Sequence, residues 1–346
     1  MTNYYSVLTP FIIPNELKYK KVNLGDGFIL NAIKRQIPFS ELRYQFSTKR
    51  SLTDSEIDLI NNGKALIIAG ANQLNADYVP WVGFSLESFN KITVPIIPFG
   101  VGYGGELHST GKMSELTKEI LLRIHGNIKF SSWRCFNTVK YLNSSVDDIG
   151  KKVLMTGCPV IYGSKLLNGE PFSSSVKKIV YTPTERGFWK KREYDTLRFI
   201  VDNFKGSEIT MVLHQDYTKL GIREYLWNLL HNQSLPRLLH AYAKKRGVAI
   251  VMPKTIEEGE SIYNDCDLHI GSRLHAHLYC LSMCKKSFLT HVDGRAVGFS
   301  EYLNFTIVDH TEISKYLDYD FEIYRKSAII HYEEMKKFIN YLREIL

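Results

Sequence analysis

The stretch CDLHIGSRLHAHLYCLSMCKKSFLTHVDGRAVGF, residues 266–299, carries the densest structural signal in the sequence. Residues 268–270 read as a buried strand, Gly271 as a tight turn, and Ser272 as the N-cap of a buried helix over 273–284 that leads into the next strand. A strand, a crossover helix and a second strand form a βαβ unit, the building block of parallel sheets. Ligands of open parallel sheets bind at the carboxyl ends of the strands, where this turn lies.

The same alternation continues outward through most of the chain and predicts an α/β fold of two Rossmann-like, doubly wound parallel-sheet domains, GT-B-like in architecture. A linker rich in Gly, Pro and Ser is expected at 164–175. It separates a domain over 1–165 from a domain over 176–319, and an amphipathic helix over 320–346 should pack on the body. Strands are expected at 65–69, 94–99, 128–131 and 153–156, then at 179–182, 209–213, 248–252, 268–270 and 287–290.

Composition and charge limit the class of protein. Of 346 residues, 44% are hydrophobic and 23% are charged, which excludes a disordered chain. Lys and Arg number 44 against 36 Asp and Glu, a net charge of +8. A basic balance favours an acidic partner, whether a nucleic acid, an anionic lipid surface, or a phosphorylated or carboxylated small molecule.

The five cysteines are scattered and include no C-x-x-C pair, which argues against a disulfide scaffold and for a reducing compartment. The first residues lack the pattern of a signal peptide, and no window approaches 18 consecutive apolar residues. We therefore expect a cytoplasmic protein, with peripheral contact to the inner face of an anionic membrane as a further expectation.

Two side chains at the turn are candidates for anion binding and for acid–base catalysis. Arg273, in the first turn of the expected helix, opposes the helix dipole unless an anion lies between them. His275 is a candidate general acid or base, because the unperturbed pKa of histidine lies near neutrality. The structural alternatives are a salt bridge to a neighbouring strand for Arg273 and a buried, hydrogen-bonded imidazole for His275.

Further basic residues follow other expected strands of the second half, namely Arg186, Lys254 and Arg295. Cations that converge on one sheet edge attract an anion with more than one charged group. For each residue alone, a solvated loop cation explains the position equally well.

A metal site is the competing interpretation of the same helix. His277, Cys280 and Cys284 share one helical face, and His275 lies near them in the sequence. Zinc sites usually take ligands from a loop or from a second element, and buried small thiols explain the cysteines at least as well. We expect no metal.

Two glycine-containing motifs occur in the first half. In VNLGDGFIL, residues 22–30, Gly25 and Gly27 permit a tight turn, and Asp26 either caps a helix that begins near Phe28 or binds a substrate. The loop PFGVGYGGEL, residues 98–107, has the spacing G-x-G-x-G-G and no acidic residue about 20 positions later. A nicotinamide cofactor is therefore not expected.

The chain resembles the polysaccharide pyruvyltransferase family over about residues 20–305. The resemblance rests on NLGDG, the glycine turn after ALIIAG, PIIPFGVGYGG, FSSWRCFNTVKYL, VLMTGCPVIY, GSRLHAHLYCLSMC and DGRAVGFSEYLNF, which occur in the family's order. It departs from the family's pattern in three places. The glycine run after the second strand is reduced to Ala69, Gly70 and Ala71, Cys158 stands where an acidic residue is frequent, and Arg295 takes the place of a lysine.

The resemblance implies a GT-B-like transferase of bacterial surface glycan biosynthesis, of exopolysaccharide or capsule. Such an enzyme moves the pyruvyl group of phosphoenolpyruvate onto two sugar hydroxyls as a cyclic ketal and releases phosphate, with no cofactor beyond this co-substrate. Residues 1–165 would then be the acceptor domain and 176–319 the donor domain. His275 would be the acid that protonates C3, and Asn23 and Asp26 would bind the acceptor. The donor would be held by Arg273, Arg186, Arg295, Ser272, Lys254 and Arg134.

Two other classes stay open at this point. In a GT-B glycosyltransferase that uses a nucleotide sugar, the same helix N-terminus would hold the diphosphate and Glu301 the ribose hydroxyls. A non-catalytic binding protein for anionic glycans is the third. The partners we expect are phosphoenolpyruvate and a saccharide, free or lipid-linked, and no nucleic acid.

Overall fold

The structure is a computed structural model that describes residues 4–11, 23–104, 111–184, 190–214, 236–290 and 294–346. The chain divides into two compact units. Unit 1 comprises Met1–Ile13, Ile29–Tyr162 and Lys326–Leu346, and unit 2 comprises Pro14–Phe28 and Gly163–Arg325. The expected acceptor and donor domains, 1–165 and 176–319, stay a prediction.

Unit 1 contains a parallel sheet in the order β2-β1-β3-β4 and a parallel pair β5-β6. Gly100, just after β4, donates its N–H to the carbonyl of Ser132 in β5 at 3.0 Å, so the pair extends the same layer. The strands are β1 (Tyr4–Thr9), β2 (Glu41–Ser47), β3 (Leu66–Ala69), β4 (Ile96–Phe99), β5 (Ser131–Trp133) and β6 (Val153–Met155). The helices are α1 (Leu24–Gln36), whose first residues belong to unit 2, α2 (Asp54–Asn61), α3 (Leu86–Asn90), α4 (Glu115–Gly126), α5 (Phe136–Ser145), and the 3-10 turns η2 (Asp147–Lys152) and η3 (Pro159–Ile161).

β1 and β2 add to the strands expected from the sequence. β1 is buried along its whole length and lies between β2 and β3 at the centre of the first sheet. Its sequence YYSVLT consists mostly of aromatic, β-branched and aliphatic residues, which are typical of a strand buried on both faces. β5 begins at Ser131, three residues later than the expected strand at 128–131.

Unit 2 contains a five-stranded, all-parallel sheet in the order β11-β10-β7-β8-β9. The chain starts in the middle at β7, moves to one edge and returns to add β10 and β11 on the other side. The topological switch point therefore lies between β7 and β10. The strands are β7 (Lys178–Thr182), β8 (Glu208–Val212), β9 (Ala249–Val251), β10 (Leu268–Gly271) and β11 (Lys286–Leu289).

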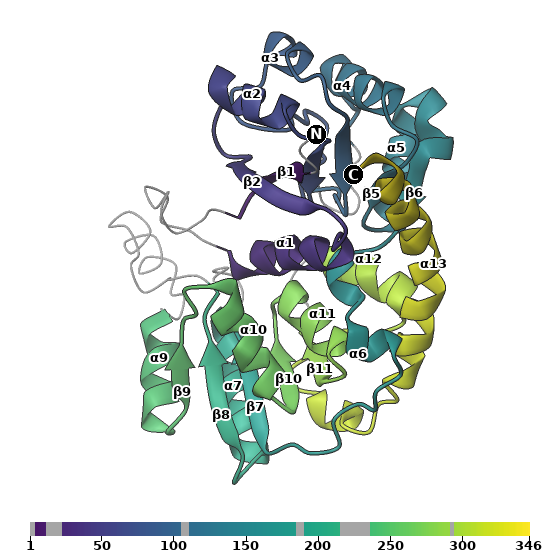
Figure 1. Ribbon diagram of the computed structural model, residues 1–346. Helices are drawn as coiled ribbons and strands as arrows, with labels where there is room; N and C mark the ends of the chain where they lie inside the picture. The colour runs from purple at the N-terminus through teal and green to yellow at the C-terminus, as the bar shows by residue number, and fades with distance from the viewer. Residues whose placement is uncertain (1–3, 12–22, 105–110, 185–189, 215–235, 291–293) are drawn as a thin grey trace. The chain divides into compact units, whose positions relative to one another are not determined.

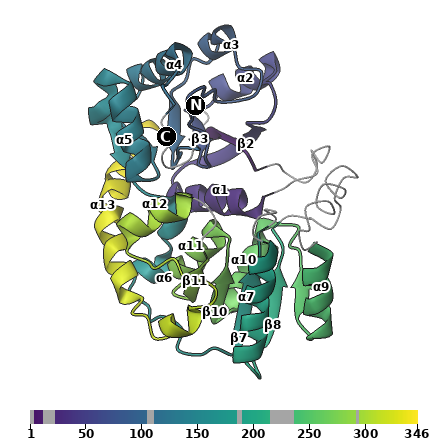
Figure 2. The same cartoon turned by 180° about the vertical axis from the view of Figure 1, so that it is seen from behind.

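Helices cover both faces of this sheet. α7 (Lys190–Asn203) and α9 (Pro236–Lys245) contact each other, as do α10 (Ile256–Asp265) and α11 (Leu274–Ser282). Figures 1 and 2, viewed from opposite sides, show α10 and α11 over one face and α7 over the other. Unit 2 also contains α6 (Ser164–Leu167), within the expected linker, α12 (Gly294–Leu303) and the 3-10 turn η5 (Ile313–Tyr316).

The chain ends in the helix α13 (Glu322–Ile345), as the amphipathic pattern over 320–346 predicts. Its later part belongs to unit 1, where Phe338 packs edge-on against Phe99 of β4 at 4.9 Å and the Tyr341 hydroxyl accepts the N–H of Lys129 at 2.9 Å. Among the helices in the described part of the chain, none is both long and apolar enough to cross a membrane.

Candidate active site

The end of β10 lies tightly between its two neighbours. A Cβ on Gly271 would lie 2.3 Å from Oγ1 and 2.4 Å from the carbonyl oxygen of Thr182 in β7. The Ser272 N–H donates to that carbonyl at 2.9 Å, and the Thr290 N–H donates to the carbonyl of Gly271 at 2.9 Å. Only glycine fits at this position. The next residues, Ser272 and Arg273, leave the sheet at its switch point.

α11 begins one residue later than the sequence pattern predicts. Arg273 is its N-cap, with extended backbone and no capping hydrogen bond, and the helix runs from Leu274 rather than from 273. Ser272 does not cap the helix, because its hydroxyl donates to Oε1 of Glu193 at 2.6 Å. Arg273 donates through Nε to the carbonyl of Pro183, just after β7, at 3.3 Å.

The start of α1 lies against His275. A Cβ on Gly25 would lie 3.0 Å from Nδ1 of the His275 imidazole, which is 7% exposed. The helix begins at Leu24, not near Phe28. Asn23, rather than Asp26, supports its first turn, because Asn23 Oδ1 accepts the N–H of Gly25 at 3.2 Å and Asn23 Nδ2 donates to Asp26 Oδ2 at 3.1 Å.

The structure thus brings the NLGDG motif and the GSRLH motif together within unit 2. About 250 residues of sequence separate the two motifs, so their meeting follows only from the tertiary fold. Asn23, Asp26, Arg273 and His275 share one neighbourhood. A side chain at position 25 would press on the imidazole of His275.

His214 is a member of this neighbourhood that the sequence reasoning missed. It follows β8, is buried, and its Nε2 lies 2.6 Å from the hydroxyl of Tyr263. Burial and the nearby charges of Arg273, His269 and His275 hold the pKa of His214 well below its usual value. Phe28 of α1 packs edge-on against His214 at 5.9 Å. The only sequence signal was a histidine at the end of a buried strand.

Arg192 and Glu193, at the start of α7, are the second finding that the sequence pattern did not indicate. Glu193 is 2% exposed and accepts hydrogen bonds from Tyr181 at 2.7 Å and from Arg192 at 3.0 Å. Arg192 Nη2 also donates to the Ser272 hydroxyl at 3.1 Å. The expected donor-binding group Ser272 therefore already has partners within the protein.

The other predicted basic residues are not brought to Arg273 by the described structure. Lys254 is exposed after β9, and β7 and β8 lie between β9 and β10, a separation of about 14 Å at ~4.8 Å per strand. Arg186 and the side chain of Arg295 lie outside the described residues. Glu301 is an exposed residue of α12.

Arg134 belongs to unit 1, where it follows β5. Its side chain is 2% exposed, and a Cβ on Gly102 would lie 2.1 Å from its Nη2, so this glycine of PFGVGYGG makes room for the guanidinium. The Cys158 thiol is buried nearby. Burial raises the pKa of Cys158 to about 11 despite the positive charge of Arg134.

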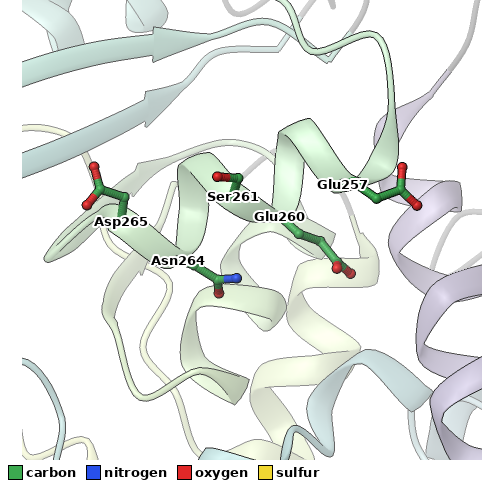
Figure 3. A pocket seen from close by; sticks show the side chains of 5 residues that line it. All are labelled: Glu257, Glu260, Ser261, Asn264 and Asp265. Carbon is green, nitrogen blue, oxygen red and sulfur yellow. The ribbon is translucent and has the colours of Figure 1, made fainter.

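The competing metal set does not converge. His277 Nδ1 lies 2.7 Å from Ser287 Oγ, and the Cys284 sulfur accepts from Arg325 at 3.7 Å. In the residues that the structure describes, no group of three His, Cys, Asp or Glu side chains is placed to hold a metal ion. A surface pocket on α10 is lined by Glu257, Glu260, Ser261, Asn264 and Asp265 and contains none of the predicted site residues (Figure 3).

Solved structures define the class. MnaA from S. aureus in complex with UDP superposes with a TM-score of 0.53 at 12% identity, over 100% of this chain and 98% of that chain. The UDP-GlcNAc 2-epimerase of Neisseria meningitidis bound to UDP-GlcNAc gives a TM-score of 0.52 at 13% identity, over 98% of this chain and 100% of that chain. Both are GT-B-fold enzymes, which confirms the predicted fold class, mixed α/β with parallel sheets.

The family follows from the sequence. The model of the polysaccharide pyruvyl transferase family matches residues 15–290, most of the chain, and the chain belongs to this family. No curated protein matches it. The chain is therefore a transferase of polysaccharide biosynthesis.

Proposed function

We propose that the chain transfers the pyruvyl group of phosphoenolpyruvate to two hydroxyls of a sugar as a cyclic ketal and releases phosphate. The observation that carries the proposal is the placement of Arg273 and His275 at the start of α11, at the switch point of the unit 2 sheet, in a member of the pyruvyl transferase family. Ligands of open α/β sheets bind at this point.

The reaction needs one proton on carbon and one leaving phosphate. The first sugar oxygen bonds to C2 while a proton adds to C3, so that the methylene becomes a methyl group. The second sugar oxygen then bonds to C2 as the C2–O bond to phosphate breaks and phosphate leaves with the electron pair. The two hydroxyl protons balance the proton on C3 and the one released with phosphate. His275 is the group we assign to deliver the proton to C3.

The donor carries a phosphate and a carboxylate, both of which bind guanidinium groups through charge-assisted hydrogen bonds. We assign donor binding first to Arg273. Arg186, Arg295, Lys254 and Arg134 are further candidates, each to be tested by substitution. For Ser272 we propose an indirect role, because its hydroxyl already bonds to Glu193 and Arg192.

The acceptor is a saccharide, free or lipid-linked, and we propose Asn23 and Asp26 as its binding residues. Their support is the contact between the start of α1 and His275. An acceptor hydroxyl held by the Asp26 carboxylate would lie in the neighbourhood of the imidazole.

A nucleotide-sugar glycosyltransferase is the second candidate. It is favoured by the two GT-B-fold structures above, which hold UDP and UDP-GlcNAc. In that case the start of α11 would hold a diphosphate, and Glu301 would bind the ribose.

Ligand stabilisation separates the two candidates. Thermal unfolding is followed with phosphoenolpyruvate, UDP or CMP, beside an assay of phosphate release from phosphoenolpyruvate with a galactoside or mannoside acceptor. We expect stabilisation by phosphoenolpyruvate alone and phosphate release that depends on the acceptor. Stabilisation by UDP or CMP alone would replace the pyruvyl donor with a nucleotide sugar.

We further propose that the reaction needs no metal and that the protein acts in the cytoplasm, in peripheral contact with anionic membranes. Arginine charge suffices for the donor, and no step needs a metal-bound water. Loss of activity with EDTA that zinc or magnesium restores would contradict the proposal that no metal is needed.

The net charge of +8 supports peripheral contact with anionic membranes. This proposal predicts that co-sedimentation with liposomes rises with their content of anionic lipid and falls with salt.

A further inference from the structure

α11 carries histidines on two of its sides. His275 and His277 are two residues apart, and residues at this spacing are about 200° apart around the helix axis. His275 lies beside Gly25 of α1, whereas His277 contacts Ser287 of β11 through Nδ1 at 2.7 Å. The side of the helix opposite His275 is therefore tied to the sheet by a polar contact.

That contact is one link in a chain of buried polar groups. His269 of β10 lies 2.7 Å from the same Ser287 Oγ through Nδ1, and 2.6 Å from Thr182 Oγ1 of β7 through Nε2. All four side chains are buried. The chain Thr182–His269–Ser287–His277 thus connects three neighbouring strands, β7, β10 and β11, to the helix that carries His275.

Within this hydrogen-bonded set, the position of each hydrogen atom depends on the positions of the others. Burial lowers the pKa of His269 to about 3 and that of His277 well below its usual value, so both rings are neutral near pH 7 and each carries one N–H. The Ser287 hydroxyl has one hydrogen and contacts two Nδ1 atoms, so it donates to one ring and accepts from the other. The two histidines therefore adopt opposite tautomers, and loss of the His277 ring leaves the Ser287 hydroxyl bonded to His269 but no longer to α11.

Hydrophobic burial by itself does not specify which side of α11 meets the sheet. All nine residues of the helix, LHAHLYCLS, are buried, so the helix has no solvent-facing side to orient it. Apolar contacts are non-directional, whereas a hydrogen bond weakens steeply away from its preferred angle. A polar contact on one side supplies the missing direction.

We propose that His277 is a positioning residue: its bond to Ser287 fixes the rotation of α11 about its axis and so the direction in which His275 projects from the first turn of the helix. The proposal rests on the function proposed above only for the chemistry of His275. The fit on the other side is close, because the Cβ position of Gly25 is 3.0 Å from the imidazole. An atom about 6 Å from the axis moves by about 1 Å for a 10° rotation, and such a displacement can lower a rate by about a hundredfold.

The test compares three variants. His277→Leu keeps an apolar side chain and removes the bond to Ser287. His277→Asn retains a hydrogen-bonding group near the position of Nδ1. His125→Leu is the matched control, because His125 is a buried histidine of α4 in unit 1 that contacts Ser131 Oγ at 2.8 Å through Nε2.

Two readouts are taken at a temperature at which every variant is folded. The first is the ¹⁵N NMR resonances of the His275 imidazole, identified by their absence from the spectrum of His275→Gln. The second is kcat and KM for phosphate release from phosphoenolpyruvate. We expect His277→Leu to shift the resonances and to lower kcat at least about tenfold with less than a threefold change in KM. We expect His277→Asn to restore both readouts and His125→Leu to change neither.

Unchanged His275 resonances in His277→Leu would overturn the proposal, as would an equal effect of His125→Leu. A shift of the resonances in a protein that releases no phosphate from phosphoenolpyruvate would leave the positioning role intact and reject the pyruvyl donor. If His277→Leu does not fold, Ser287→Ala takes its place, because it removes the shared hydroxyl and leaves both rings.

Discussion

Ala71 has a backbone conformation that glycine adopts at no cost and alanine does not. Its φ is +64°, and the preceding Gly70 has a φ of +56°. This turn follows β3, beside the switch point of the unit 1 sheet, where the family's glycine run is reduced. A β-carbon in the left-handed region costs roughly 1–2 kcal/mol.

We predict that Ala71→Gly raises the free energy of unfolding by up to about 1 kcal/mol, because the relief of strain is partly offset by the greater freedom of glycine in the unfolded chain. Urea denaturation of the two proteins measures the change. Ala243→Gly is the control. Ala243 is buried in helix α9, and glycine in a helix interior should lower the free energy of unfolding by about 1 kcal/mol. A destabilised Ala71→Gly would contradict the argument from strain.

Substitution of Arg273 should impair donor affinity, whereas substitution of His275 should impair turnover. Arg273→Ala removes a charge-assisted contact, so affinity for phosphoenolpyruvate should fall about ten- to hundredfold, or roughly 1.5–3 kcal/mol. His275→Gln keeps a hydrogen-bonding group but cannot exchange a proton near neutrality, so kcat should fall about 10²- to 10⁴-fold with little change in affinity.

Calorimetric donor binding and the phosphate-release assay measure these two effects. Arg198→Ala is the control for charge, because Arg198 is an exposed residue of α7 paired with Asp202. Near-parental turnover by His275→Gln would show that His275 is not the acid and would favour a structural histidine.

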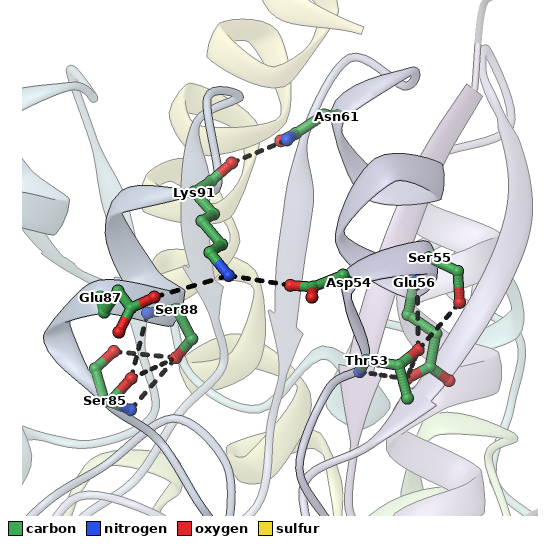
Figure 4. Close-up of polar contacts among 9 residues, drawn as sticks. All are labelled: Thr53, Asp54, Ser55, Glu56, Asn61, Ser85, Glu87, Ser88 and Lys91. Carbon is green, nitrogen blue, oxygen red and sulfur yellow. Dashed lines mark hydrogen bonds and ion pairs between the residues drawn. The ribbon is translucent and has the colours of Figure 1, made fainter.

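At the scale of elements, α2 shows how local sequence sets a helix start. Thr53 Oγ1 accepts the N–H of Glu56 at 3.3 Å, and Glu56 Oε2 accepts the N–H of Thr53 at 2.9 Å, which together form a capping box (Figure 4). Arg50 donates to Glu56 at 2.6 Å and, with Thr53, lowers the pKa of the Glu56 carboxyl. The helix start is thus held by groups within six residues of each other.

We predict that Thr53→Ala lowers the free energy of unfolding by about 1 kcal/mol, because one N–H at the helix start loses its acceptor. Thr53→Ser should be nearly neutral, since the serine hydroxyl caps equally well. The midpoint of urea unfolding measures both, and an equal loss in the two variants would assign the effect to the methyl group rather than to the cap.

Across the whole molecule, buried histidines contribute to the loss of stability in mild acid. Burial lowers the pKa of His125 to about 4 and that of His269 to about 3, and holds His214 and His277 well below their usual pKa. Unfolded histidine titrates near pH 6.5. Below that pH the unfolded chain binds protons that the folded chain does not.

We therefore predict a stability that is fully present above about pH 6.5 and is lost progressively as the pH falls toward the folded pKa values. Each of these histidines should contribute about 1.4 kcal/mol per pH unit below the unfolded pKa. Urea unfolding between pH 8 and pH 5 measures the slope. His125→Asn should reduce that slope by about one proton, and a flat profile would show that the rings are protonated in the folded state.

Features that depend only on neighbouring residues could be predicted from the amino-acid sequence. The strands of unit 2 are all expected from short apolar runs, and the GSRLH turn lies at a strand end as predicted, because burial and turn chemistry repeat over a few residues. Even β1 has a strand composition that is readable in YYSVLT. The family motifs are likewise local and were sufficient to identify the family that the chain belongs to.

Which of these local features meet depends on the tertiary fold. The Ser272 hydroxyl bonds to Glu193, 79 residues away, and the N-cap of α11 is Arg273 rather than Ser272. Strand order separates Lys254 from Arg273, and no local pattern encodes that order. Gly25 meets His275 for the same reason: packing between distant segments depends on the complete fold, whereas periodicity and capping depend only on the residues next along the chain.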